Sequence, residues 1–249
     1  ELAAIRAAAQ ATGAALTGVA ALLTAAGAED GELWLGAERL RVARLRAEIA
    51  VSLAARGLAQ PEGNIVAPGE EGAVPHSTGR DDRVLSPGES LIVDLFPKGA
   101  LFADCTRTFC VGPPPEALAR AHGAVLEALR AAHAAAAPGT RGWSLQEQTC
   151  GLLAGRGYPT PITQPGTTRG YVHGLGHGVG YELHELPSFK KQAAADGVLA
   201  AGDVLTLEPG LYEPSEGWAV RLEDLCWLGE DGSELLTPLP YELDPRAWV

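Results

Sequence analysis

The chain has 249 residues, of which 46% are apolar and 20% charged, and its formal net charge is −12. A chain of this length and composition can bury a sizeable core, so we expect a globular protein. The acidic balance repels phosphate backbones and anionic lipid headgroups, so we expect neither nucleic acid nor a membrane as a partner. No uninterrupted apolar run reaches the roughly 18 residues of a membrane span, and the first residues lack the pattern of a signal peptide.

The cysteines and the missing methionine bear on compartment and chain length. Four cysteines, at positions 105, 110, 150 and 226, form no Cys-x-x-Cys pair. A domain of this size needs no disulfides, and free thiols are typical of a reducing compartment, so we expect a cytoplasmic protein. The sequence contains no methionine and therefore not its own initiator. We expect a segment upstream of Glu1.

Apolar residues recur every three or four positions in the first part of the chain. They predict one amphipathic helix over about 1–27 and a second over about 37–56, which stops at Gly57. Turn-rich sequence then continues to about Ser90.

Two strands, Leu91–Phe96 and Phe102–Val111, are predicted next, joined as a hairpin by a turn centred on Gly99. With this turn, Asp94 lies opposite Asp104. Directly opposed side chains are about 5 Å apart, and two carboxylates that close require a shared proton or a cation between them. Taken alone, Asp94 could equally be an ordinary strand residue with a polar neighbour.

The second part of the chain repeats this order of elements. A third helix is predicted over about 115–137, a fourth begins at a capping box of Ser144 and Glu147, and strands follow near 171–175, 203–208 and 219–228. Helix, helix and carboxylate hairpin thus occur twice, and Asp94 and Glu208 are 114 positions apart. We expect two structurally similar halves in one compact domain, residues 1–249.

Histidine and glycine are concentrated in His173-Gly174-Leu175-Gly176-His177-Gly178-Val179-Gly180, followed by His184. So many glycines favour backbone packed closely against a site, with the imidazoles as ligands or proton-transfer groups. A single histidine here would more often be structural, whereas three within twelve residues favour a site.

Glu208 and Glu223 are two further carboxylates embedded in strand sequence. Period-two alternation places Arg221 on the face of Glu223, so we expect Arg221 to hold that carboxylate. Four acidic oxygen donors and an imidazole suit two hard or borderline cations such as Mn²⁺, Co²⁺ or Zn²⁺, whereas a structural zinc site would recruit thiols.

Five motifs occur in order along the chain: Ile92-Val93-Asp94, Asp104-Cys105-Thr106-Arg107-Thr108-Phe109, His173 to Gly180 with His184-Glu185, Leu207-Glu208-Pro209-Gly210, and Arg221-Leu222-Glu223-Asp224. With them, essentially the whole chain resembles the pita-bread metallopeptidases, which include methionine aminopeptidase, aminopeptidase P and prolidase. The resemblance implies an α+β pita-bread (creatinase/aminopeptidase) fold of two pseudo-symmetric halves, with helices outside a curved antiparallel sheet. The second and third motifs look more like the proline-directed branch than methionine aminopeptidase.

The resemblance also implies two divalent metal ions, Mn²⁺ foremost and Zn²⁺ or Co²⁺ as alternatives. The implied ligands are Asp94, Asp104, His177, Glu208 and Glu223. Asp94 would chelate one ion, Asp104 and Glu223 would bridge both, and the other two ligands would complete the second. Asp94 and Asp104 are one residue closer than is usual in the family, and Ala219 stands where glycine is frequent.

Catalytic roles follow from the same resemblance. Water activated by the two ions is the implied nucleophile, and Glu208 would help to deprotonate it. His184 and His173 would stabilise the tetrahedral intermediate or contact the substrate. His76 matches a substrate-side histidine and, with Arg221, is assigned to substrate binding, although a lone loop histidine is most often merely solvated.

The implied activity is hydrolysis of Xaa-Pro bonds in short proline-containing peptides. An Xaa-Pro dipeptidase is favoured over aminopeptidase P, with methionine aminopeptidase well behind. A dipeptidase needs a cation for the terminal carboxylate, for which Arg169, Lys190 and Lys191 are candidates. The resemblance further implies a homodimer whose upstream domain borders the partner's active site. A metal-free peptide-binding module and a creatinase-like hydrolase are alternatives that retention of all five ligands disfavours.

Overall fold

The computed structural model describes residues 1–75, 77–193, 197–230 and 232–249. Its first half begins with two helices and a small three-stranded sheet and continues into a second three-stranded sheet. In chain order the elements are α1 (Leu2–Ala25), β1 (Gly27–Glu29), β2 (Glu32–Leu35), β3 (Glu38–Arg39), α2 (Val42–Ala54), β4 (Asn64–Pro68), the short helix α3 (Gly69–Gly72), β5 (Leu91–Leu95) and β6 (Cys105–Phe109).

The second half has the same sequence of helices followed by strands. Its elements are α4 (Glu116–Ala135), α5 (Gly142–Gly155), β7 (His177–Gly178), β8 (Glu185–Ser188), β9 (Val204–Leu207), β10 (Gly210–Glu213), β11 (Trp218–Arg221), β12 (Asp224–Gly229), β13 (Gly232–Leu235) and a 3₁₀ turn, η2 (Pro245–Trp248). Apolar residues at helical spacing give α4 a buried face that includes Leu118, Val125 and Leu129.

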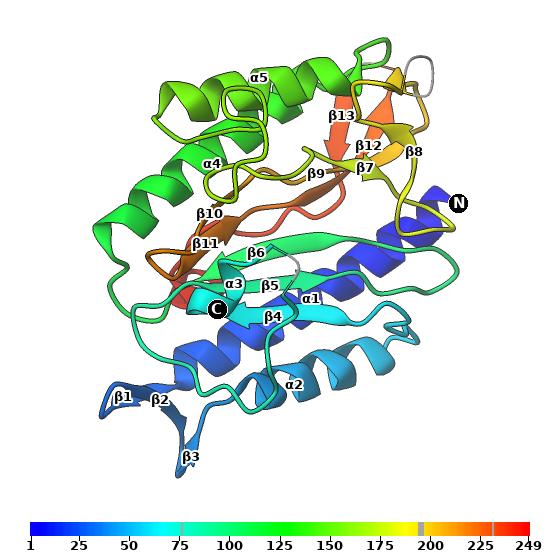
Figure 1. The fold of residues 1–249 in the computed structure, drawn as a ribbon. Coiled ribbons are helices and arrows are strands. Elements are labelled where there is room, and N and C mark those ends of the chain that lie inside the picture. Colours follow the sequence, from blue (N-terminus) through cyan, green and yellow to red (C-terminus); the bar gives the residue numbers. More distant parts are fainter. Residues whose placement is uncertain (76, 194–196, 231) are drawn as a thin grey trace.

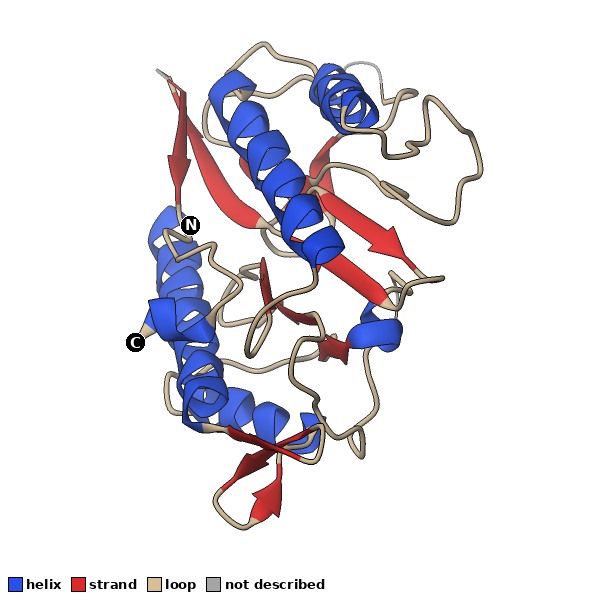
Figure 2. Cartoon of the chain, turned by 90° about the vertical axis from the view of Figure 1, so that its left-hand side faces the viewer, coloured by secondary structure: helices blue, strands red, loops and turns tan. Residues whose placement is uncertain are grey.

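The described strands pair in antiparallel fashion throughout. The sheets have the strand orders β4-β5-β6, β13-β12-β9-β7-β8, β10-β11 and β1-β2-β3. In Figure 1, α4 and α5 lie above the main strands, α2 lies below them, and α1 runs diagonally behind β4 to β6. Helices again lie outside the strands in the turned view of Figure 2. The expected α+β architecture is confirmed.

Each half has a hydrophobic core of its own. In the first half, α1 and α2 pack on β4 to β6 through residues such as Leu16, Leu45 and Val93. In the second, α4 and α5 pack on β9 to β12 through residues such as Leu129, Leu153 and Leu205. Both sheets therefore turn one face toward their helices, which leaves the other faces to meet between the halves.

Among the described helices, α1 alone is long and apolar enough, by length and composition, to cross a membrane. About half of its most apolar window, 56%, is buried inside the domain. Its buried residues include Leu16, Val19 and Leu23, which belong to the core of the first half. The helix thus has the packing of a core helix.

The halves are joined where β6 meets the segment 221–224. The Glu223 amide donates to the Thr106 carbonyl oxygen at 3.0 Å, and the Thr108 hydroxyl donates to the Arg221 carbonyl oxygen at 2.9 Å. The guanidinium of Arg107 donates to the Glu223 carbonyl oxygen at 2.6 Å. It also lies 2.7 Å from the Asp224 carboxylate, and neither side chain of this ion pair is exposed. We call these contacts the inter-half seam.

The expected pairing of Asp94 with Asp104 across a hairpin is wrong in register. Asp94 lies opposite Thr106, and β6 begins only at Cys105. Lys98 forms a β-bridge with Phe102, and the Ala103 amide donates to the Pro97 carbonyl oxygen at 3.0 Å, so the turn closes around Ala100 and not around Gly99. The hairpin is therefore shifted by one residue in its turn, and Asp104 lies just before the first residue of β6.

The expected helices are present with somewhat shorter bounds, but the capping box is not. Helix α5 begins at Gly142 with Arg141 as its N-terminal cap. Because Ser144 already lies inside the first turn, its hydroxyl donates to the Arg141 carbonyl oxygen at 2.7 Å instead of capping an amide.

Three strand expectations also need correction. The turn-rich region contains β4, which pairs with β5. Residues 171–175, all described, form no strand, and the nearest strand is β7. The strand expected over 219–228 is interrupted at Leu222 and Glu223, which gives β11 and β12.

The buried ion pair of the seam predicts a large effect on stability. Arg107→Met keeps much of the side-chain volume but leaves the Asp224 carboxylate buried without its cation. We expect the free energy of unfolding to fall by roughly 3–5 kcal/mol, because removal of one partner of a buried pair strands the other charge. Urea denaturation followed by circular dichroism measures it.

The control is Arg156→Met, which removes an ion pair to Glu127 whose side chains are 60% and 45% exposed. Exposed pairs contribute less than about 1 kcal/mol. Equal losses of stability in the two variants would contradict the role given to the seam.

Candidate metal centre

Five side chains from both halves converge on one point between the sheets. Asp104, His177 and Glu223 each offer a ligand atom within 4.8 Å of the others. His177 Nε2 lies 3.7 Å from a carboxylate oxygen of Asp104 and 3.7 Å from one of Glu208. The negative charge of Asp94 acts on Asp104, Glu208 and Glu223, which places it in the same cluster. All five expected ligands are thus brought together.

The glycines around His177 let the backbone approach its neighbours closely. A Cβ atom at Gly176 would lie 2.0 Å from the Thr206 carbonyl oxygen, and one at Gly178 would lie 1.9 Å from that of Leu186. His177 Nδ1 is 3.1 Å from the Gly178 carbonyl oxygen, which can only accept, so Nδ1 carries the proton. The lone pair of Nε2 therefore faces the carboxylates.

Arg221 does not hold Glu223, and that expectation is wrong. Its guanidinium donates to Asp94 at 2.6 Å, to the Tyr212 hydroxyl at 2.8 Å and to the Thr106 hydroxyl at 3.2 Å. Because β11 ends at Arg221, the alternation of faces does not continue to Glu223. Arg221 lies behind Asp94 as its cationic partner.

The two glutamates are fixed in different ways. The Glu223 carboxylate accepts a hydrogen bond from the Thr106 hydroxyl at 2.7 Å. The Glu208 amide donates to the Leu175 carbonyl oxygen at 2.7 Å, which ties the end of β9 to the histidine-rich segment. Glu223 is buried, whereas the Glu208 side chain keeps 21% of its surface exposed. Glu208 is therefore the carboxylate of this pair that solvent can reach.

Burial and mutual repulsion dominate the electrostatics of the cluster. Burial raises the pKa of the Glu208 carboxyl to about 8. Burial and then the neighbouring carboxylates raise the pKa values of Asp104 and Glu223 well above their usual range. Burial lowers the pKa of His177 to about 4, so this imidazole is neutral at pH 7. Four carboxyl groups thus share one close guanidinium.

The donor set fits divalent cations. Among the described residues, the buried side-chain oxygens that lack a hydrogen-bond partner are Asp94 Oδ1 and Asp104 Oδ1. Such orphaned acceptors are costly unless a proton or a cation compensates them. Carboxylate oxygens with a neutral imidazole nitrogen are ligands of hard or borderline metals.

A cavity of about 890 Å³ opens beside the cluster and is lined by His173, His177 and His184. The rings of His177 and His184 are 4.3 Å apart. His173 Nε2 lies 3.0 Å from the Tyr212 hydroxyl, and its Nδ1 lies 4.0 Å from Glu208. His173 and His184 thus stand on the cavity side of the ligands. His76 lies outside the described residues.

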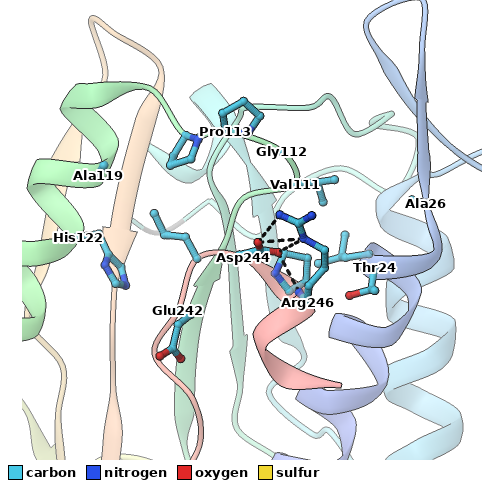
Figure 3. A pocket seen from close by; sticks show the side chains of 14 residues that line it. Thr24, Ala26, Val111, Gly112, Pro113, Ala119, His122, Glu242, Asp244 and Arg246 are labelled. Atoms are coloured by element: carbon cyan, nitrogen blue, oxygen red, sulfur yellow. Dashed lines mark hydrogen bonds and ion pairs between the residues drawn. The ribbon is translucent and has the colours of Figure 1, made fainter.

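A second cavity, of about 820 Å³, lies between the end of α1, the start of α4 and the C-terminal segment (Figure 3). Two of its charged side chains are engaged with each other, since Asp244 accepts hydrogen bonds from Arg246. His122 Nε2 is 2.7 Å from the Tyr241 carbonyl oxygen. None of the expected site residues that the structure describes lines this cavity.

Thr106 and Tyr212 support the cluster, and neither was expected from the sequence. Thr106 contacts both Glu223 and Arg221, and Tyr212 joins Arg221 to His173. The alternation of polar residues in β6 is a weak signal for Thr106. Nothing in the sequence around Tyr212 indicates its role, because its partners His173 and Arg221 lie elsewhere in the chain.

Helices lie outside antiparallel sheets, around a buried cluster of carboxylates and an imidazole that is suited to binding divalent metals. The sequence pattern of metallopeptidase family M24 matches residues 3–230. The chain belongs to this family.

Individual relatives agree with the family. The Xaa-Pro dipeptidase of Pyrococcus furiosus is 36% identical over 183 residues, which cover 72% of this chain and 48% of the relative. Xaa-Pro aminopeptidase 2 of Streptomyces coelicolor is 32% identical over 272 residues, covering 100% of this chain and 55% of the relative. The chain spans about half the length of the curated relatives it matches.

The crystal structure of the prolidase from Pyrococcus horikoshii OT3 superposes with a TM-score of 0.82 at 28% identity. The matched region covers 98% of this chain and 63% of the prolidase chain. This likeness confirms the expected pita-bread fold.

The raised pKa of Glu208 predicts how stability depends on pH without metal. The pKa of this carboxyl is about 8 in the folded chain, whereas an unperturbed glutamate has a pKa of 4.5. At pH values between these two pKa values, the Glu208 carboxyl keeps its proton in the folded state but has lost it in the unfolded state. The free energy of unfolding therefore falls as pH rises. We therefore expect the unfolding temperature of EDTA-treated protein to decrease as the pH is raised from about 5 to about 8.

Added Mn²⁺ should reduce this fall, because a bound cation compensates the ionised carboxylates. Scanning calorimetry with EDTA and with Mn²⁺ at each pH makes the comparison. Parallel profiles would contradict a cation site formed by these carboxylates.

Proposed function

We propose that this chain is the catalytic domain of a two-metal exopeptidase that hydrolyses Xaa-Pro bonds, most simply an Xaa-Pro dipeptidase. The observation that carries the proposal is the convergence of four carboxyl groups and a neutral imidazole beside an open cavity. The similarity to a named Xaa-Pro dipeptidase supports the choice of bond.

The proposed ligands of two divalent cations are Asp94, Asp104, His177, Glu208 and Glu223. Mn²⁺ is the first choice, with Zn²⁺ and Co²⁺ as alternatives, because oxygen donors predominate. The orphaned oxygens of the two aspartates support this assignment. Such ions, when bound, lower the pKa of water and polarise a carbonyl group.

Glu208, Arg221 and the histidines that line the cavity are proposed to divide the remaining roles. Glu208 is proposed to take the proton of the attacking water, since it is the partly exposed carboxylate. His173 and His184 line the same cavity and are proposed to donate hydrogen bonds to the substrate's carbonyl oxygen as it gains charge. Arg221 is proposed to position Asp94, and its contacts do not support the substrate-binding role expected from the sequence. The role of His76 stays a prediction.

Replacement of Glu208 tests its proposed role as the base that accepts the proton of the attacking water. Glu208→Gln keeps the shape but removes the charge and the proton acceptor, so we expect turnover to be abolished while the fold survives. Steady-state kinetics, metal analysis and circular dichroism give the three readouts. More than a few per cent of wild-type kcat with the metal content unchanged would assign the base to another group.

The cavity also supports recognition of a free terminal carboxylate. Apart from its histidines, Lys190 is the one basic side chain among the described residues that line it. Arg169 is paired with Glu213 at 3.2 Å, and the Lys191 ammonium lies over the ring of Trp143. Of the three expected cations, Lys190 is therefore the one we propose for the carboxylate of the leaving proline. This favours a dipeptidase.

Substrate length separates the two leading activities. We expect Ala-Pro to be cleaved with kcat/KM at least tenfold above Ala-Pro-Ala and Met-Ala-Ser in the presence of Mn²⁺, a difference of about 1.4 kcal/mol in transition-state stabilisation. The preference should shrink in Lys190→Met and persist in Lys191→Met. Equal or better cleavage of Ala-Pro-Ala would instead identify an aminopeptidase, as in the Streptomyces relative.

A cytoplasmic location, an upstream domain and a homodimer stay predictions. Fractionation addresses the first, and intact mass with light scattering on the full-length gene product addresses the other two. A metal-free peptide-binding module is the alternative from another class, and bound metal after mild purification would exclude it.

A further inference from the structure

The carboxylate of Asp224 lies directly behind the metal centre. Asp224 follows Glu223 in the chain, but its partners are a different set of groups. It is fully buried and accepts hydrogen bonds from Arg107 at 2.7 Å and from the Tyr241 hydroxyl at 2.7 Å. Its third partner is His133, whose Nε2 is 3.0 Å away.

Arg107 connects this carboxylate to the main chain of Glu223. One terminal nitrogen of the guanidinium is bonded to Asp224, and the other donates to the carbonyl oxygens of Glu223 at 2.6 Å and Thr106 at 3.0 Å. The orientation of Arg107 therefore depends on where the Asp224 carboxylate lies. Through Arg107, that position also determines the backbone that presents the Glu223 side chain to the metal centre.

His133, in the last turn of α4, is oriented by groups on both ring nitrogens. A carboxylate can only accept, so the ring donates its Nε2 hydrogen to Asp224. The Nδ1 atom lies 3.4 Å from Cys226 Sγ. Burial raises the pKa of the Cys226 thiol well above its usual value, so the thiol keeps its hydrogen and can donate to Nδ1. The pair of contacts selects one ring orientation and one tautomer.

We infer that His133 is a positioning residue for the metal ligand Glu223, acting through Asp224 and Arg107. The inference rests on the proposed two-metal function. Without His133, one oxygen of Asp224 keeps Tyr241 as its only side-chain donor. The carboxylate then has freedom to rotate, and Arg107 no longer holds the Glu223 backbone in one place. Groups behind a ligand typically control metal affinity in this way.

A second histidine of α4 supplies a matched control. His122 is also half-buried, and its Nε2 contacts a main-chain atom, the Tyr241 carbonyl oxygen at 2.7 Å. It lies at the second cavity (Figure 3) and has no contact with the Asp224 carboxylate. Loss of its side chain removes one buried hydrogen bond without removing a donor from Asp224.

The test compares two amide substitutions of His133 that differ in reach. In His133→Gln the amide nitrogen can occupy the place of Nε2 and donate to Asp224, whereas in His133→Asn it reaches only the place of Nδ1. We expect His133→Asn to weaken Mn²⁺ binding by about tenfold or more, while His133→Gln and His122→Asn stay within about threefold of wild type. Isothermal titration of the purified proteins gives the affinities, and thermal midpoints report general loosening.

Tyr241→Phe removes another donor to the same carboxylate and should weaken Mn²⁺ binding in the same direction, which keeps the test open if His133→Asn does not fold. Wild-type Mn²⁺ affinity in a folded His133→Asn protein, or an equal loss of Mn²⁺ affinity in His122→Asn, would overturn this inference but not the proposed function. A wild-type protein that binds neither Mn²⁺, Zn²⁺ nor Co²⁺ would overturn the proposed function and this inference with it.

Discussion

The buried ion pair between Arg107 and Asp224 is the contact on which the rest of the site depends. Each half has its own core, and a smaller apolar cluster, with Phe102 from one half and Leu225 from the other, packs between them beside this ion pair. Burial of two charges is costly and is offset only when geometry and further hydrogen bonds are good. Arg107 satisfies that condition with bonds to main-chain oxygens of both halves, including those of Thr106 and Glu223. The seam thereby sets the distance between ligands from opposite halves.

The seam brings together more negative charge than the protein itself neutralises. Arg221 compensates Asp94 at 2.6 Å, but the other carboxyl groups raise one another's pKa values. Such a site is electrostatically incomplete, so a cation that binds there also stabilises the fold. The histidine-lined cavity is open, and the partly exposed Glu208 lies 4.0 Å from His173 on its wall, so a substrate can approach there. Stability and the proposed activity therefore share the same residues.

The proposed ligands stand out in the sequence because several of them break a local rule. Asp94 and Glu223 are charges within apolar strand sequence, and the glycines beside His177 leave no room for a Cβ atom. What local sequence could not give was long-range pairing. Strand register was a further gap, because the turn closes around Ala100 and not around Gly99, which places Thr106 opposite Asp94. The partner of Arg221 depends on a strand break at Leu222. Strand β4 was missed because five residues ending in proline resemble the turns around them.

The central claim is that five side chains from the two halves enclose two divalent cations. Anomalous X-ray diffraction from crystals grown with Mn²⁺ tests it most directly, because the signal locates the ions independently of activity. We expect two anomalous peaks enclosed by the five ligands, one of them on the side of Asp94 and the other on the side of His177. Absence of peaks there, or Mn²⁺ bound only elsewhere on the protein, would contradict the claim.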